Sequence, residues 1–514
     1  MIDVVTDKAR PLVSLIVTPC DRRDLMLRSL RSATAQDYAN LQIILANDGS
    51  DDLPKLAASP RNPRIALVPS PSGRRLGPML NAAVSQARGE YVAYLTGPDV
   101  HYAFHVSSLV AALSAAPECQ VAYGDFYKTY CKLRSDAKPV VMGKAVAGGD
   151  DFDRMLLSLR DCIRLSAVMH RRGLLHRAGL FDESLEALAE WDLLRRLAFY
   201  TDFVHVPQVT GEFFCPVDGD AWSSAAGRDD EAFAQSTLAI RAKRPPKPWP
   251  KMPDVSIIFV PHRLDAAAAT IDEVRRHTFV PYRIYLPLAG HELGLLDMCA
   301  LDVVGVPVAP GTPQDARVDK ALARCEGDYA AVVLGGLRPE TGWVEFPLQA
   351  LMKTGLPDRA FVVPNQPEGA WAAVFRTDQL LNARRANPAL SVRGSVQEAG
   401  IVVGEPADQD HPLAQHRLLA EARRLQQEGS WHKAAAVYQG AKDWRKSLPI
   451  QRQALRSLHH AGRLEEAMEM SRGLNQRHPT VQTLLVEGKL LRRANRTNEA
   501  VVALREAQAV LMRG

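Results

Sequence analysis

Short apolar runs alternate with amphipathic segments along the first part of the chain. Residues 13–17 read Val-Ser-Leu-Ile-Val, which has the length and composition of a buried parallel strand. Apolar positions at helical spacing follow it, and residues 78–87 predict a further helix. This alternation is typical of a parallel α/β sheet. The predicted strands are residues 13–17, 41–46, 64–68 and 91–95.

A proline-rich stretch interrupts this pattern at residues 243–253, where regular structure is disfavoured and the chain is stiffened. Directly after it, residues 255–260 read Val-Ser-Ile-Ile-Phe-Val, similar to the first strand, and residues 323–329 are similar to 86–91. We therefore predict a second domain on the same plan. The predicted boundaries are 1–242 for the first domain, 243–253 for the linker and 254–408 for the second domain.

The last hundred residues show no strand pattern, and small residues recur there at a fixed interval. A period near 34 residues, with small residues where helices cross, is typical of tetratricopeptide repeats. We predict an all-α domain of such repeats over residues 412–514, with an ordinary helical bundle as the alternative. The residues that recur 33 apart are Gly429, Gly462 and Asn495, and likewise Ala434, Ala467 and Ala500.

The composition of the chain disfavours several classes of protein. The net charge of +5 is small for 514 residues, and no run of Lys and Arg stands out, which disfavours nucleic-acid binding. The seven cysteines are dispersed without a Cys-x-x-Cys pair, which favours a reducing compartment over a disulfide framework or zinc site. Residues 1–10 lack the apolar core of a signal peptide, and no apolar stretch reaches about 18 residues. We expect a cytoplasmic protein without a transmembrane segment, and peripheral attachment to the inner membrane stays open.

Several motifs between residues 11 and 214 occur in the order of one enzyme family. They are the strand and loop at 13–22, the segments 36–38 and 43–51, the helix and strand at 80–95, and the segments 179–183 and 190–196. They resemble the opening strand, the Gln-x-Tyr and Asp-Asp-Gly-Ser segments, the approach to the Asp-x-Asp motif, and the acceptor-side segment of family 2 glycosyltransferases. The resemblance implies a GT-A (Rossmann-like) fold that binds a nucleotide-sugar.

The donor site is expected where the first strands end. Ligands of open α/β sheets bind beyond the carboxyl ends of the strands, and the loops at 18–22 and 47–50 both begin there. Asp48 can accept the ring N–H of a uracil-like base, which favours a UDP-linked donor. The resemblance implies nucleotide-sugar contacts from Thr18, Pro19, Asp21, Asn47, Asp48, Asn81 and Asp99.

The metal motif of the family is altered in this chain. The aligned residues read Thr96-Gly97-Pro98-Asp99, so a proline stands where the family has a metal-binding carboxylate. Asp99 and His101, in a shifted register, would be the remaining ligands for Mg²⁺ or Mn²⁺. The alternatives are a solvated carboxylate beside a packed histidine, and arginines that bind the diphosphate without a metal. The candidate arginines are Arg74, Arg75, Arg171 and Arg172.

An inverting transferase needs a base for the acceptor hydroxyl. By resemblance, Ala189-Glu190-Trp191-Asp192 places Glu190 at the position of the catalytic carboxylate, and Asp192 would cap or orient the following helix. The alternative for Glu190 is an acidic residue that only stabilises the helix start.

The second domain lacks these groups. Residues 287–290 (Pro-Leu-Ala-Gly) replace the Asn-Asp-Gly turn, and residues 334–337 contain no carboxylate. A site without acidic groups neither holds the metal nor acts as a base. We therefore expect a degenerate GT-A-like domain with a structural or acceptor-positioning role.

The sequence supports three functional hypotheses. The first is an inverting glycosyltransferase that moves a sugar from a nucleotide-sugar to a glycan or protein acceptor in bacterial surface-polysaccharide or glycoconjugate synthesis. Its helical tail would dock the acceptor or a protein partner. The second is an inactive pseudo-glycosyltransferase scaffold that recruits partners through its repeats. The third is a regulator that binds the donor without turnover.

Overall fold

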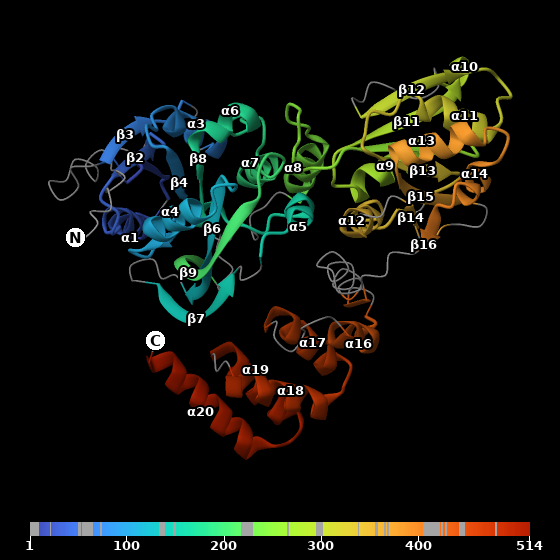
Figure 1. Ribbon diagram of the computed structural model, residues 1–514. Helices are drawn as coiled ribbons and strands as arrows, with labels where there is room; N and C mark the ends of the chain where they lie inside the picture. Colours follow the sequence, from blue (N-terminus) through green and yellow to red (C-terminus); the bar gives the residue numbers. More distant parts are fainter. Residues whose placement is uncertain are drawn as a thin grey trace, which may run out of the picture.

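The chain forms two α/β units and a helical tail (Figure 1). The structure is a computed structural model. It describes residues 10–20, 22–49, 53, 65–71, 75–132, 139–147, 151–216, 230–264, 267–293, 302–337, 339–354, 358–363, 366, 370–404, 422, 425–426, 429–440, 448–477 and 481–513.

The first sheet is built around β1 (Val13–Val17), which lies between two parallel neighbours. Val13 is opposite Leu41 of one neighbour and Tyr91 of the other. Because the chain proceeds to opposite sides of β1, a crevice is expected at the carboxyl ends of these strands. The strand order is β3-β2-β1-β4-β8-β6-β9-β5, with β7 paired to β6. The other strands are β2 (Leu41–Asn47), β3 (Ile65–Pro69), β4 (Tyr91–Leu95), β5 (Val100–His101), β6 (Val121–Lys132), β7 (Val140–Ala147), β8 (Val168–Arg171) and β9 (Phe203–Pro216).

Helices cover both faces of this sheet, because successive strand residues point to opposite sides. Ile16 packs in one apolar cluster with residues of α3 and α7, whereas Leu15 packs in another with residues of α1 and α4. Trp191 of α7 is buried, and its indole N–H donates to the carbonyl of Leu157 at 2.6 Å, which fixes α7 against α5. The helices are α1 (Arg23–Thr34), α3 (Leu76–Ser85), α4 (His105–Ala115), α5 (Arg154–Leu159), α6 (Leu175–Ala178), α7 (Ala189–Leu197) and α8 (Asp230–Ala242), with 3₁₀ turns at Leu165–Ala167 and Arg172–Leu174.

The second sheet repeats this arrangement, as its sequence predicts. β10 (Val255–Val260) lies between parallel strands β11 and β13, and β15 runs antiparallel to β13 as β8 does to β4. The strand order is β12-β11-β10-β13-β15-β14-β16. Its strands are β11 (Tyr282–Ala289), β12 (Val303–Val308), β13 (Tyr329–Leu334), β14 (Arg359–Val362), β15 (Trp371–Arg376) and β16 (Val402–Gly404), and its helices are α9 (Ala267–His277), α10 (Gly290–Leu293), α11 (Gln314–Leu322), α12 (Glu345–Thr354), α13 (Thr377–Ala386) and α14 (Val392–Glu398).

One local contact recurs at equivalent positions of the two sheets. The hydroxyl of Ser14 in β1 accepts a hydrogen bond from the N–H of Gly89 at 2.8 Å, and Ser256 in β10 accepts one from Gly327 at 3.0 Å. A Cβ atom on either glycine would lie within 3 Å of backbone atoms, so no larger residue fits without a shift. The shared contact indicates that both sheets follow one plan.

The proline-rich linker lies against the first domain. Residues 243–254 contain neither helix nor strand, in agreement with the prediction. Trp249 packs edge-on against Phe199 with ring centroids 5.2 Å apart, and the hydroxyl of Tyr200 donates to the carbonyl of Pro246 at 2.6 Å. The linker is therefore a packed strap rather than an extended spacer.

A buried arginine connects the two units. Arg195 of α7 donates to the carbonyls of Lys243 and Arg241, each at 3.1 Å, and to that of Phe279 in the second domain at 3.2 Å. Figure 1 shows α8 lying between the two sheets at this junction.

The tail consists of helices that pack consecutively against one another. Gly429, Gly462 and Asn495 all have left-handed backbone conformations, with φ of 75°, 77° and 58°. After each of them, the next N–H bonds the carbonyl five residues earlier, which is a common helix C-terminal motif. The predicted 33-residue period is thus present in the backbone, and its assignment as a tetratricopeptide array stays a prediction. The helices are α16 (Trp431–Gly440), α17 (Leu448–His460), α18 (Leu464–Arg477), α19 (Val481–Arg493) and α20 (Thr497–Arg513).

Within the described residues, no helix has both the length and the apolar character needed to cross a membrane.

Candidate functional site

The turn after β4 lies at the carboxyl edge of the first sheet. The hydroxyl of Thr18, at the end of β1, accepts a hydrogen bond from the N–H of Gly97 at 3.0 Å. Gly97 has a φ of 61°, in the left-handed region that favours glycine. The predicted nucleotide residue Thr18 and the altered metal motif are therefore neighbours.

Ser166 holds this turn in place from the 3₁₀ turn that leads into β8, the strand next to β4. Its hydroxyl donates to Oδ2 of Asp99 at 2.6 Å and accepts from the N–H of Thr96 at 3.0 Å. Since a serine hydroxyl has only one hydrogen, Thr96 must be the donor in its 2.9 Å contact with Ser166. The turn thus presents a fixed geometry.

Asp99 forms a bidentate ion pair with Arg164. Nε and Nη2 of Arg164 donate to the two carboxylate oxygens at 2.6 and 2.9 Å, and Asp99 is fully buried. The guanidinium also lies over the ring of Phe213, 4.3 Å from its centroid. The side chain of Arg164 is 39% exposed. Bidentate geometry of this kind fixes the orientation of an arginine.

A cavity of about 220 Å³ lies beside this pair. Thr96, Arg164, Phe213 and Glu190 all line it. Glu190 is half-buried and is the second residue of α7, while Arg164 precedes the 3₁₀ turn that leads into β8. The structure therefore brings the predicted base and a cation into one cavity.

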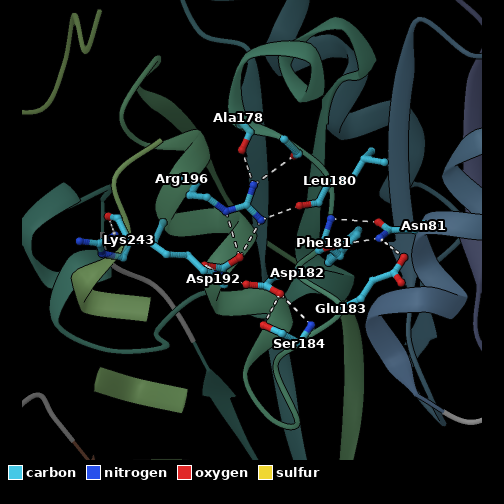
Figure 2. Close-up of polar contacts among 12 residues, drawn as sticks. Asn81, Ala178, Leu180, Phe181, Asp182, Glu183, Ser184, Asp192, Arg196 and Lys243 are labelled. Atoms are coloured by element: carbon cyan, nitrogen blue, oxygen red, sulfur yellow. Dashed lines mark hydrogen bonds and ion pairs between the residues drawn. The ribbon is translucent and has the colours of Figure 1, made fainter. Parts of the chain in front are cut away.

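A buried ion-pair network orients α7 (Figure 2). Arg196 donates to Asp192 through Nε at 2.9 Å and Nη2 at 2.7 Å, and to the carbonyl of Leu180 at 2.7 Å. Lys243 of the linker pairs with Asp192 at 2.8 Å and also with Asp182. Asp192 orients the helix through side chains, as one of the two predicted roles requires.

The residue before α7 has an unusual backbone. Leu188 is buried and has a φ of 64°, a left-handed conformation that a non-glycine residue rarely adopts. Such a conformation costs on the order of 1–2 kcal/mol and persists only where the surroundings impose it. The turn at Leu188 sets the direction in which α7, and with it Glu190, begins.

Asn81 holds a loop. Its Oδ1 accepts from the N–H of Phe181, and its Nδ2 donates to the carbonyl of Phe181 and to Oε1 of Glu183, all at 2.9 Å (Figure 2). These bonds tie α3 to the segment before α7. The Asn81 amide therefore stabilises this loop, and its predicted contact with the nucleotide-sugar stays a prediction.

Asp99 and His101 each have a protein partner. The Nε2 atom of His101 lies 2.8 Å from the carbonyl oxygen of Ser166, and the His101 ring stacks on His105 with centroids 3.7 Å apart. Burial lowers the pKa of His101 to about 4, so the ring is neutral near pH 7. In the part of the chain that the structure describes, no group of three or more His, Cys, Asp or Glu residues could hold a metal ion. Asp99 and His101 alone are not the oxygen-rich set that Mg²⁺ or Mn²⁺ prefers, and the predicted metal stays a prediction.

The arginines suggested as diphosphate ligands lie elsewhere. Arg171 is opposite Tyr91, at the amino end of β4, and bonds Glu90, while Arg172 bonds the carbonyl of Gly89. The expectation that Arg171 and Arg172 bind the diphosphate was wrong, because the crevice is at the other end of the sheet. Arg75 bonds the carbonyl of Glu183, and Arg74 lies outside the described residues.

The remaining predicted nucleotide residues cluster at the strand ends. Asn47 ends β2, and its Oδ1 accepts from the N–H of Gly49 at 3.1 Å, which forms an Asx turn. Pro19 and Asp48 are half-buried beside the crevice edge, and Asp21 lies outside the described residues. No sequence motif pointed to Arg164, because its partner is 65 residues away.

Comparison with known proteins agrees with this arrangement. Residues 14–172 match the family model described as glycosyl transferase family 2. Over these residues the first domain is similar to family 2 glycosyltransferases. The match includes the turn with Asp99 and the arginine that binds it, whereas Glu190 lies beyond the matched residues.

The matches between this chain and its relatives cover only part of the chain. The chain is 26% identical over 189 residues to the uncharacterized glycosyltransferase RP339 of Rickettsia prowazekii. This match covers 36% of the chain and 57% of that protein. The chain is 31% identical over 90 residues to the succinoglycan biosynthesis protein ExoO of Rhizobium meliloti, covering 17% of this chain and 26% of that protein. A crystal structure of S. aureus TarS in complex with UDP-GlcNAc is 15% identical with a TM-score of 0.35, over 45% of this chain and 65% of that one. The chain thus spans little more than half the length of RP339.

Proposed function

We propose that the chain is an inverting glycosyltransferase that transfers a sugar from a nucleotide-sugar, UDP-linked by preference, to a hydroxyl group of a glycan or protein acceptor. The observation that carries the proposal is the cavity shared by Glu190 and Arg164 beside the turn that contacts Thr18. A base and a cation on one cavity are the two groups that the reaction requires.

Glu190 acts as the base. It takes the proton of the acceptor hydroxyl as that oxygen attacks the anomeric carbon of the donor sugar, and the bond to the diphosphate oxygen breaks from the opposite face. Single displacement inverts the anomeric configuration. The nucleoside diphosphate leaves with the electron pair of the broken bond.

Arg164 stabilises the leaving diphosphate. Two of the five N–H donors of Arg164 bind Asp99, and three remain on a side chain that is 39% exposed and lines the cavity. Guanidinium donors match phosphate oxygens in bidentate geometry. Asp99 is then a positioning residue for the arginine. Because Pro98 offers no metal ligand, the arginine supplies the positive charge that a metal would otherwise bring.

The same domain would bind the nucleotide at the strand ends. Asp48 accepts the ring N–H of the base, and Thr18, Pro19 and Asn47 line the approach to the diphosphate. The name of the relative ExoO, a succinoglycan biosynthesis protein, supports a role in bacterial polysaccharide or glycoconjugate synthesis, which we place in the cytoplasm. The helical tail would dock the acceptor or a protein partner.

One observation favours a second candidate, an inactive pseudo-glycosyltransferase scaffold. Both oxygens of Asp99 accept hydrogen bonds from Arg164, and Pro98 occupies the position of the other carboxylate. A site of this kind could bind a nucleotide without turnover.

The first experiment measures thermal unfolding with UDP, GDP, CDP and dTDP, each with and without Mn²⁺. A ligand at a hundred times its dissociation constant stabilises the native state by about 2.7 kcal/mol. We expect a rise with UDP that does not need Mn²⁺ and that is lost in Asp48→Ala. A rise that appears only with Mn²⁺ would contradict the role given to Arg164.

The second experiment measures release of UDP from UDP-sugars in single-turnover assays. Glu190→Gln should lose about 10²-fold or more in rate while it keeps the thermal shift. Glu186→Gln is the matched control, because Glu186 is an exposed carboxylate just before α7. Nucleotide binding without UDP release in the wild type, with any acceptor tried, would instead support the scaffold.

A further inference from the structure

The second domain has a cavity of its own. Its volume is about 270 Å³, close to the lower end of the roughly 300–1,000 Å³ typical of small-ligand pockets. Val260 ends β10 and Leu288 lies near the end of β11, so the cavity opens at the carboxyl ends of these strands. The strand order reverses at β10, and ligands of open α/β sheets bind at such a point.

The residues around this cavity differ in type from those of the first domain. By strand register, Val260 replaces Thr18, Ala289 replaces Asp48, and the buried apolar Leu337 replaces Asp99. The acceptor for a base N–H and the carboxylate that holds the phosphate-side arginine are both absent from these positions. The cavity therefore lacks the features expected of a nucleotide site.

The polar groups of the cavity are balanced in charge. Glu292 lies 3.8 Å from Arg317, and its Oε2 accepts from the N–H of Ala289 at 2.7 Å. Arg317 donates through Nε to the carbonyl of Thr312 at 2.9 Å, which fixes its side chain. One carboxylate against one guanidinium leaves no excess positive charge for a diphosphate.

A glycine makes room for a further polar group. Gly335, with a φ of 90°, lies against His262, and a Cβ atom at Gly335 would be 2.6 Å from Nε2 of that histidine. His262 can therefore lie over the end of β13, where it lines the cavity together with Gln314. Carboxylate, guanidinium, amide and imidazole groups line the cavity together with the apolar residues Pro261 and Leu264.

We propose that this cavity binds a neutral saccharide. Each sugar hydroxyl both donates and accepts hydrogen bonds, and the mixed donors and acceptors of Glu292, Arg317 and Gln314 match this chemistry. The apolar face of a pyranose packs on Pro261 and Leu264, which are half-buried and also line the cavity. The site goes beyond the proposed transfer reaction: it gives the second domain a glycan-binding role that requires no turnover in the first.

The test is ligand-observed saturation-transfer NMR on the full chain with methyl glycosides of glucose, galactose, mannose and N-acetylglucosamine. We expect transfer to at least one glycoside, at least fivefold weaker in both Arg317→Met and Gln314→Leu. Lys320→Met is the matched control, because Lys320 is an exposed cation on the same helix and does not line the cavity. It should keep the full signal, and thermal unfolding checks that each variant is folded.

The outcomes separate this site from the donor site. A glycoside signal that persists with saturating UDP and in Glu190→Gln supports the proposal, whatever the first domain does. The proposal is overturned if no glycoside receives saturation, or if the signal is unchanged in both Arg317→Met and Gln314→Leu. It is also overturned if inorganic pyrophosphate, and no glycoside, binds in a manner that Arg317→Met abolishes.

Discussion

Substitution of Arg164 tests how much its ion pair with Asp99 contributes to the stability of the first domain. Arg164→Met keeps most of the volume of the side chain and leaves Asp99, which is fully buried, with the hydroxyl of Ser166 as its remaining hydrogen-bond donor among the contacts described above. The change therefore leaves a buried charge without its counter-charge, which is more costly than the loss of the attraction alone.

The magnitude follows from burial. Breaking a buried ion pair by removing one partner costs about 3–5 kcal/mol. Because Arg164 is 39% exposed, solvent screens part of the interaction, and we expect about 2–3 kcal/mol here. For a domain of this size, that corresponds to a fall of roughly 4–12 °C in the melting temperature. The double variant Arg164→Met with Asp99→Asn should recover most of this loss, because it removes the unpaired charge.

Differential scanning calorimetry measures the melting temperatures, and hydrogen exchange of peptides around residues 96–101 assigns the change to the turn after β4. Arg160→Met is the matched control, since Arg160 is exposed at the end of α5. Additive losses in Arg164→Met, Asp99→Asn and the double variant would refute the reasoning, because residues in contact should show coupling of at least about 1 kcal/mol.

Three further predictions concern the rest of the chain. Burial raises the pKa of Glu345 to about 7, against about 4.3 in an unfolded chain, so its contribution to stability is complete below about pH 4 and lost as pH rises through 7. Relative to Glu345→Gln, the wild-type free energy of unfolding should fall by roughly 3 kcal/mol over this range in urea titrations, and parallel pH profiles would contradict the assignment. Gly89→Ala and Gly327→Ala should each lower stability by about 2 kcal/mol or more in calorimetry, because their Cβ atoms meet backbone, whereas Gly173→Ala should be near neutral since nothing lies within 4 Å of its Cβ position. Lys243→Met removes a cation from two carboxylates in Figure 2 and should cost about 2 kcal/mol, and an unchanged melting temperature would exclude the linker as a stabilising strap.

Much of the fold could be predicted from local sequence patterns. The strands at 13–17, 91–95 and 255–260 have the predicted bounds, because strands buried on both faces read as continuous apolar runs. The period of the tail was readable because left-handed turns favour glycine or asparagine and close helix packing favours alanine. Glu190 was found through its place in a family motif, and the structure sets it in a cavity.

Other features depend on which strands become neighbours. Arg164 meets Asp99 because β8 runs antiparallel beside β4, and Asn81 meets Phe181 across 100 residues of sequence. No local residue pattern encodes such partners, since sheet order arises from the packing of the whole domain. The sequence alone therefore determined the elements, the repeated plan and a candidate base. Only the tertiary structure decided that Arg164 pairs with Asp99, and that the second sheet keeps a polar cavity at its carboxyl edge.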